Sequence, residues 1–242
     1  MARGRTLVVT AVPAERDAVT LATGAPPDQF TLPTGLPLHR GPAWDVVAVG
    51  VGPAAAAAGT ATVLALTRGR YDLVVAAGIG GGFAPVAAVG DTVVADELVA
   101  ADLGAEDPEG PTGFLDVAEL GFGQVRHRPP AGLAAAGAAA TGGVLGTVLT
   151  VSTTTGTAER AAALTARHPG AAAEGMEGHG VATAAGAHQL AVLEIRTVSN
   201  PVGPRDRAAW RIPGALRALT DTFAALGPAV DQWRREHHEH DG

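Results

Sequence analysis

Short aliphatic runs alternate with helical segments along most of this chain of 242 residues. The runs expected to form strands are rich in valine and lie at 6–12, 45–51, 72–77, 90–99, 144–151 and 190–198. The segments expected to form helices begin near Ala14, cover 53–66 and 158–167, follow Met176 and Glu177, and cover 214–226. Strands that alternate with helices predict an α/β fold, a three-layer α/β/α sandwich around a mostly parallel mixed central sheet.

Neither an internal repeat nor a long linker divides the chain. Residues 1–236 are expected to form one domain, which is long enough to bury a full core. Residues 101–123, rich in Asp, Glu, Gly and Pro, are expected to form a loop. Residues 237–242 (HHEHDG) are expected to be a flexible tail, whose histidines are more simply solvated than metal ligands. We expect no metal and no cofactor.

The composition excludes several classes of partner. The net charge is −7, which argues against a nucleic-acid partner because binding to nucleic acid needs a basic face. The first residues lack the long apolar stretch of a signal peptide, and the longest apolar runs are too short to span a membrane. We therefore expect a cytoplasmic protein with no membrane partner, and the absence of cysteine excludes disulfides.

Residues that could bind a ligand follow the predicted strands at their carboxyl ends, the edge at which open α/β sheets bind ligands. They are Glu15, the glycines within 50–52 and 78–82, the threonines 153–155, Met176 with Glu177, and Ser199 with Asn200. A carboxylate suits ribose hydroxyls, a thioether packs against the sugar and an amide reads a base edge. This set of side chains predicts a pocket for a purine nucleoside.

The glycine-rich segments do not match nucleotide-binding motifs. Neither VGVGP (49–53) nor GIGGG (78–82) fits the dinucleotide pattern, and a P-loop is excluded because the chain has no lysine. Gly50 and Gly52 are as consistent with a purely structural, tight strand-to-helix turn as with a role in ligand binding. Gly80–Gly82 favour a close approach of the backbone to a flat ligand.

Five segments resemble the purine nucleoside phosphorylase/hydrolase superfamily, and within it the nucleosidase branch that includes methylthioadenosine/S-adenosylhomocysteine nucleosidase. They are TAVPAE (10–15), VGVGPAAAAAG (49–59), AAGIGGGFAPVAAVGDTVVADE (76–97), GMEG (175–178) and IRTVSN (195–200). SNPVGPRDRAAW (199–210) is similar to the futalosine hydrolases, a family of the alternative menaquinone route. The resemblance implies hydrolysis of a purine N-glycosidic bond in a small nucleoside substrate, and a homodimer or larger homo-oligomer.

The resemblance also assigns catalytic roles. Glu15 falls on the carboxylate that activates water, Glu177 on the ligand of the ribose hydroxyls, and Met176 on the residue that packs against the sugar. One position departs from the family pattern, which often has glutamate directly before the methionine. This chain has Gly175 there, and Glu174 stands one place earlier.

Asn200 falls where adenine-specific members of the family carry aspartate. An ionised carboxylate only accepts hydrogen bonds, whereas an amide can donate one to a 6-oxo oxygen, so Asn200 favours hypoxanthine or guanine. The resemblance makes Arg196 a buttress of the site and lays Ile79 and Gly80 along the base. The remaining expected substrate-binding residues are Gly81, Thr153, Thr154 and Ser199.

Futalosine also carries a carboxyphenyl group on its 5′ side, and a guanidinium matches a carboxylate bidentately. Arg205 and Arg207, in the proline-rich loop 201–213, are the candidates. The alternative is a surface loop whose arginines pair with Asp206. Trp210 could supply an apolar wall nearby or serve only in packing.

Three other functions remain open. A methylthioadenosine-type nucleosidase is disfavoured by Asn200. A phosphorylase needs cations beside the sugar, and only Arg16 and Arg40 are candidates because neither glycine turn carries an arginine. A nucleoside-binding sensor that lacks catalysis is disfavoured by Glu15.

Overall fold

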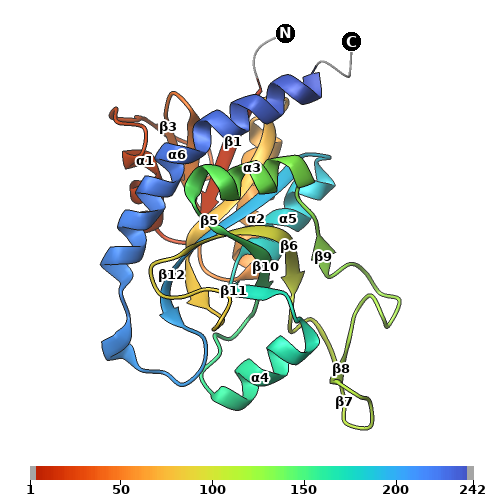
Figure 1. Cartoon of the computed structure of the whole chain (residues 1–242). Coiled ribbons are helices and arrows are strands. Elements are labelled where there is room, and N and C mark those ends of the chain that lie inside the picture. The colour runs from red at the N-terminus through yellow and green to blue at the C-terminus, as the bar shows by residue number, and fades with distance from the viewer. Residues whose placement is uncertain (1–3, 239–242) are drawn as a thin grey trace.

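The computed structural model describes residues 4–238 and is built on one mixed sheet of ten strands (Figure 1). Its centre is the long strand β5 (Tyr71–Gly82), which pairs in parallel with β1 (Arg5–Thr10) on one side and β12 (Ala191–Pro201) on the other. Beyond β1 lies β4 (Trp44–Ala48), also parallel. The α/β class predicted from the alternating pattern is confirmed.

The other half of the sheet curls back toward its centre. From β12 it continues through β6 (Thr92–Ala100) and β10 (Val144–Thr150) to β11 (Ala171–Gly175). Strand β11 pairs a second time, antiparallel, with the end of β5, so that Glu174 lies opposite Gly81. The glycine-rich end of β5 is therefore enclosed between β11 and β12.

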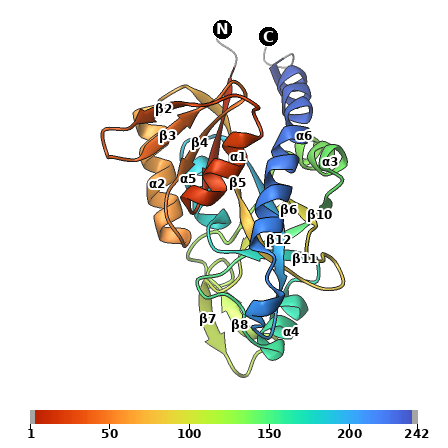
Figure 2. The same ribbon diagram turned by 90° about the vertical axis from the view of Figure 1, so that its left-hand side faces the viewer.

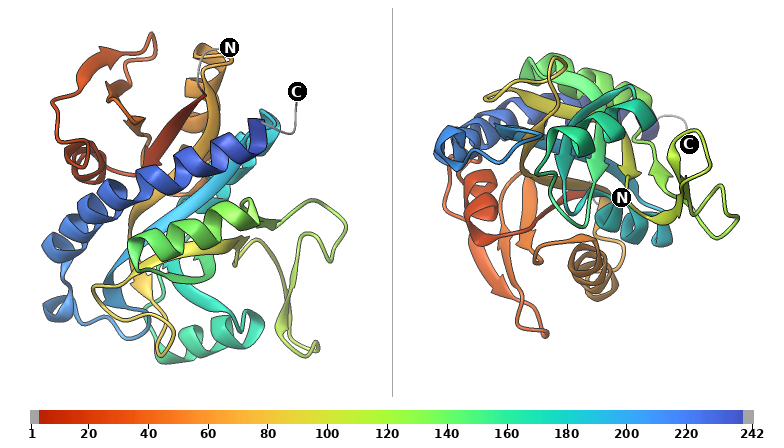
Figure 3. Two further views of the ribbon diagram at one scale, coloured as in Figure 1. Left: turned by 45° about the horizontal axis from the view of Figure 1, so that its top comes forward. Right: turned by 90° about the horizontal axis from the view of Figure 1, so that it is seen from below.

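Helices cover both faces of the sheet (Figures 1 and 2). Helices α1, α3 and α6 pack on one face, where α6 lies beside α3 (Figure 3), and α2 and α5 pack on the other. Their bounds are Pro13–Leu21 (α1), Pro53–Leu66 (α2), Ala131–Thr141 (α3), Gly178–Ala187 (α5) and Ile212–His238 (α6), with α4 (Ala158–Arg167) beyond the end of β10. Each face thus has its own apolar core.

The apolar run of β5 serves both cores, because successive side chains of a strand point to opposite faces. Leu73 and Val75 are buried under α3 and α6, whereas Val74 and Ala76 are buried under α2 and α5. A strand covered on both sides has no polar face, which explains why the sequence shows a continuous apolar run here rather than an alternating one.

Several short strands were not predicted from the sequence. Strands β2 (Asp28–Thr31) and β3 (Pro37–Arg40) form a hairpin on the edge of the sheet (Figure 2). The segment 101–123, expected to be a loop, contains the hairpin of β7 (Gly104–Asp107) and β8 (Gly113–Asp116). Strands β2, β7 and β8 are short and contain no buried residue, and β3 buries only Leu38 and His39, so none of them shows a hydrophobic period.

Helix α3 and the two-residue strand β9 (Arg126–His127) were also not predicted, and helix α6 extends well past its expected end at residue 226. It includes His237 and His238, so the first two residues of the expected tail are helical, and 239–242 lie outside the described residues. Within residues 4–238, no helix is long and apolar enough to cross a membrane, and no cluster of acidic or histidine side chains could hold a metal ion.

Candidate active site

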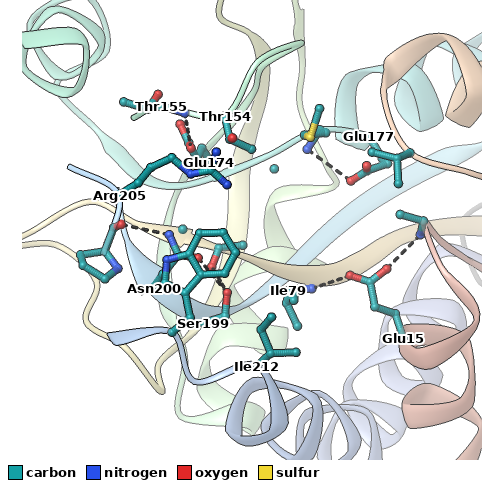
Figure 4. Close-up of a pocket in the computed structure, with 18 of the residues that line it drawn as sticks. Glu15, Ile79, Thr154, Thr155, Glu174, Glu177, Ser199, Asn200, Arg205 and Ile212 are labelled. Atoms are coloured by element: carbon teal, nitrogen blue, oxygen red, sulfur yellow. Dashed lines mark hydrogen bonds between the residues drawn. The ribbon is translucent and has the colours of Figure 1, made fainter. Parts of the chain in front are cut away.

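A pocket opens at the carboxyl ends of β1, β5 and β12 (Figure 4). The expected site residues that line it are Glu15, Ile79, Gly80, Gly81, Thr154, Met176, Glu177, Ser199, Asn200 and Arg205. They come from five separate parts of the sequence, and the sheet brings them together as the strand-end argument predicts.

Glu15 lies in the first turn of α1 and is 4% exposed. Its Oε2 accepts hydrogen bonds from the backbone N–H groups of Ala11 (3.0 Å) and Val12 (3.2 Å), and its Oε1 accepts one from Ile79 (2.9 Å). A carboxylate offers about four lone-pair directions, so one remains for a water molecule in the pocket. Burial raises the pKa of Glu15, although the charge of Arg196 and the Ile79 N–H oppose this effect.

Glu177 is held across the pocket by three donors. Its Oε1 accepts from the backbone N–H of Gly52 (3.1 Å), and its Oε2 accepts from the N–H of Met176 (3.2 Å) and contacts Arg196 Nη2 (3.1 Å). Gly52 adopts a φ of 94°, which favours glycine and directs its N–H toward the carboxylate. The glycine turn therefore both reverses the chain and supports a functional acid.

Arg196 lies beneath the pocket floor rather than in its lining. Its Nε donates to Glu194 Oε1 (2.9 Å), its Nη1 donates to the Ile79 carbonyl (3.3 Å), and its side chain is 2% exposed. Burial lowers the pKa of Arg196, but the charges of Glu194 and Glu177 raise it by more, so the guanidinium stays charged. It is a buried cation that holds Glu177 and offsets the surrounding carboxylates.

Two glycines leave the space that this cation needs. A Cβ on Gly78 would lie 2.5 Å from Glu15 Oε1 and 3.0 Å from Arg196 Nη1. A Cβ on Gly175 would lie 2.6 Å from Arg196 Cζ. In this chain, the guanidinium of Arg196 occupies the place that a side chain at position 175 would take.

We expect Gly175→Ala to destabilise the protein by about 1–3 kcal/mol, because the buried guanidinium must move to admit a methyl group. Urea unfolding measures this change. Gly132→Ala is the matched control, because Gly132 lies in helix α3 and no atom lies within 4 Å of its Cβ position. Equal stability of the two variants would contradict the prediction.

Asn200 has a fixed amide orientation. Its Nδ2 donates to the Pro201 carbonyl (3.0 Å), and the Ser199 hydroxyl lies 2.9 Å from Oδ1. A flipped amide would place two oxygens together at Pro201, so the observed orientation is the favourable one. One N–H of Nδ2 is left for a ligand.

Glu174 also lines the pocket, at the side of the threonine loop, and it is 4% exposed. Its Oε1 accepts from the backbone N–H of Thr155 (2.9 Å). Burial raises the pKa of Glu174, and the hydrogen bonds from Thr155 oppose that shift. It therefore faces the pocket from β11, a short strand that the sequence reading missed.

Besides Arg196, two expected substrate-binding residues do not line the pocket. Arg207 is exposed in the short helix η1 (Arg207–Ala209), and Thr153 is exposed before the two threonines that do line the site. A turn points successive side chains in different directions, so neighbours in sequence do not share a surface. Arg16 and Arg40, the candidates for a phosphate, also lie outside the lining.

Thr155 and Trp210, named above as possible ligand-binding residues, also line the pocket, whereas the lining residues Ala11, Val12, Val51, Glu174 and Ile212 were not predicted. Glu174 stands beside residues already singled out, so proximity in sequence was the available signal. The apolar members carry no chemical signal of their own. The glycines at 80–82 also have a role that was not predicted, because a Cβ on Gly80 would lie 2.5 Å from the Glu174 carbonyl oxygen.

The chain is similar to proteins of known family. The model of the phosphorylase superfamily matches residues 7–226. A futalosine hydrolase of Streptomyces coelicolor is 61% identical over 232 residues, which cover 94% of this chain and 97% of that protein. A futalosine hydrolase of Acidothermus cellulolyticus is 47% identical over 230 residues, covering 92% and 90%.

A solved structure shows the same fold. The methylthioadenosine/S-adenosylhomocysteine nucleosidase of Colwellia psychrerythraea 34H, in complex with adenine, matches with a TM-score of 0.75. The match covers 93% of this chain and 96% of the other at 24% sequence identity. The likeness establishes that the two chains share the same architecture.

Proposed function

The chain belongs to the phosphorylase superfamily, and we propose that it hydrolyses the N-glycosidic bond of futalosine, releasing hypoxanthine and dehypoxanthine futalosine for menaquinone biosynthesis. The observation that carries the proposal is the 61% identity to a futalosine hydrolase over almost the whole of both chains. The chemistry of the pocket supports it in three ways.

The pocket suits a 6-oxopurine riboside. We place the base against Gly80 and Gly81 with its 6-oxo edge toward Asn200, whose remaining N–H can donate to that oxygen. The ribose then lies between Met176 and Glu15, and its hydroxyls reach Glu177. Adenine would present an amino group to the amide donor, which would leave a buried polar group unpaired.

Glu15 is the proposed general base. Its free lone-pair direction can take a proton from a water molecule that attacks the anomeric carbon on the face opposite the base. Glu177 binds ribose hydroxyls and stabilises the positive charge that develops on the sugar in an oxocarbenium-like transition state. Asn200 cannot act as a general acid, so the leaving purine is stabilised by hydrogen bonds and takes its proton from water.

Hydrolysis is favoured over phosphorolysis by the distribution of cations. Among the described residues, Arg205 is the single arginine in the pocket lining, and Arg196 is engaged by Glu194 and Glu177 beneath it. A phosphate beside the sugar would face Glu15 and Glu177 with no free cation near them. The residues around the proposed ribose position therefore suit water rather than phosphate.

The test is a side-by-side incubation with futalosine, inosine and methylthioadenosine, with and without phosphate, followed by measurement of the free base. We expect hypoxanthine from futalosine at a rate independent of phosphate. Release of base only when phosphate is present would replace hydrolysis by phosphorolysis. Faster turnover of methylthioadenosine would favour the nucleosidase alternative.

We further propose that Arg205, the arginine of the pocket lining, binds the carboxylate of the 5′ substituent. Arg205→Ala should raise the KM for futalosine about tenfold or more, since a charge-assisted hydrogen bond contributes about 1.5–3 kcal/mol. Arg207→Ala is the matched control and should leave KM unchanged, because Arg207 does not line the pocket. Equal KM values for the two variants would remove this role from Arg205.

We also propose that the protein is a homo-oligomer and that it is cytoplasmic. The family resemblance implies a homodimer or larger homo-oligomer, which sedimentation of the purified chain would test. The proposed cytoplasmic location agrees with a substrate that is a small soluble nucleoside.

A further inference from the structure

One carboxylate oxygen in the pocket has no partner. Glu174 Oε1 is satisfied by the Thr155 N–H, but Oε2 is buried and has no hydrogen-bond partner among the described residues. Buried polar atoms are normally satisfied, so an unpaired carboxylate oxygen on a side chain that lines the pocket indicates that a ligand completes it.

Glu174 and Asn200 flank the same glycine. The Cβ position of Gly81 lies 3.4 Å from Glu174 Cγ and 3.3 Å from Asn200 Nδ2. This follows from the double pairing of the end of β5, which has β11 on one side and β12 on the other. Figure 4 shows both side chains at the same end of the pocket, opposite Glu15 and Glu177. A ring that lies on Gly81 can therefore meet both.

We propose that Glu174 determines the base specificity of this site by accepting a hydrogen bond from N1–H of a 6-oxopurine through its free Oε2. The inference rests on the proposed function, because it uses the position proposed there for the base. A 6-oxopurine presents an oxygen acceptor beside an N1–H donor, whereas a 6-aminopurine presents the reverse pair. Asn200 Nδ2 donates and Glu174 Oε2 accepts, so together they complement the first pair and oppose the second.

The contact with Thr155 explains how this polarity arises. A bare Thr155 N–H would offer the base a donor, which suits the N1 lone pair of adenine. Because Glu174 takes that N–H with Oε1, the group presented to the ligand is the other carboxylate oxygen, an acceptor. The short side chain of Thr155 and the glycines of β5 leave room for the carboxylate of Glu174.

Glu174→Gln tests the proposal because the contact with Thr155 fixes the orientation of the new amide. Its oxygen must accept the Thr155 N–H, so its NH₂ group faces the pocket and replaces an acceptor by a donor. We expect kcat/KM for futalosine to fall about 10–100-fold, and that for the 6-amino analogue of futalosine to hold or rise. If Glu174 had only a structural role, the substitution would lower kcat/KM for the two substrates by the same factor. Glu159→Gln, on the exposed face of α4, is the control and should change neither.

Binding of the free bases separates this inference from the proposed function. Calorimetry should show that the unaltered protein prefers hypoxanthine to adenine and to 1-methylhypoxanthine, which lacks N1–H, by at least about tenfold, and that Glu174→Gln loses the preference. The 1-methyl probe needs no variant and so does not depend on how the variant folds. Absence of futalosine turnover with this preference intact would overturn the function alone. Equal binding of hypoxanthine and 1-methylhypoxanthine, or an unchanged preference in the variant, would overturn the role of Glu174.

Discussion

Replacing Glu15 by glutamine is expected to lower kcat for futalosine about 10²–10⁴-fold while the affinity for hypoxanthine changes little. Glutamine has nearly the same shape but cannot take a proton from water. Its amide also cannot accept on both ends, and Glu15 accepts from Ala11 and Val12 at one oxygen and from Ile79 at the other. Steady-state kinetics and calorimetry with hypoxanthine measure the two quantities separately.

The pH profile provides an independent check on the same residue. Burial raises the pKa of Glu15 above its ordinary value of 4.5. A general base works only when it is ionised, so activity should decline as the pH falls through this raised pKa. Asp17→Asn, an exposed acid of the same helix, should retain the activity of the unaltered protein. A Glu15→Gln variant as active as this control would remove Glu15 from the mechanism.

The sequence predicts the position of this acid because its surroundings are local. Glu15 follows β1 by a short turn, and two of its three donors belong to that turn. Asn200 is predicted for a similar reason, since it ends the long apolar run of β12. A strand end followed by polar residues is a pattern that the sequence itself displays.

The opposite wall of the pocket depends on contacts that no local pattern displays. Strand β11 is only five residues long and consists of AAAEG, which reads equally as the start of a helix. Its second pairing, with Gly81 and Gly82 of β5, arises from the curl of the whole sheet. Glu174 therefore stands in the sequence as an ordinary acid, and only the fold places it beside Asn200. The same limit explains why Thr153 and Arg207 were expected in the pocket.

The buried cation Arg196 links the carboxylates of Glu177 and Glu194. We expect Arg196→Met to destabilise the protein by about 3–5 kcal/mol, because removal of one partner leaves buried carboxylates uncompensated. Glu177 is 6% exposed, Glu194 is fully buried, and both contact the guanidinium. Burial already raises the pKa of Glu194, and Arg196 is the charge that opposes this. Urea unfolding at neutral pH measures the loss.

Two further variants decide whether charge, rather than lost packing, is responsible for the loss. Arg128→Met removes an arginine that is 80% exposed and paired with Glu97, and it should change stability by no more than about 1 kcal/mol. Arg196→Met combined with Glu194→Gln removes one of the stranded carboxylates and should regain part of the stability. It should not regain activity, because Glu177 still lacks the cation that holds Oε2 toward the ribose. If the double variant is no more stable than Arg196→Met alone, then the buried cation acts by filling space, and the charge argument for the pocket floor fails.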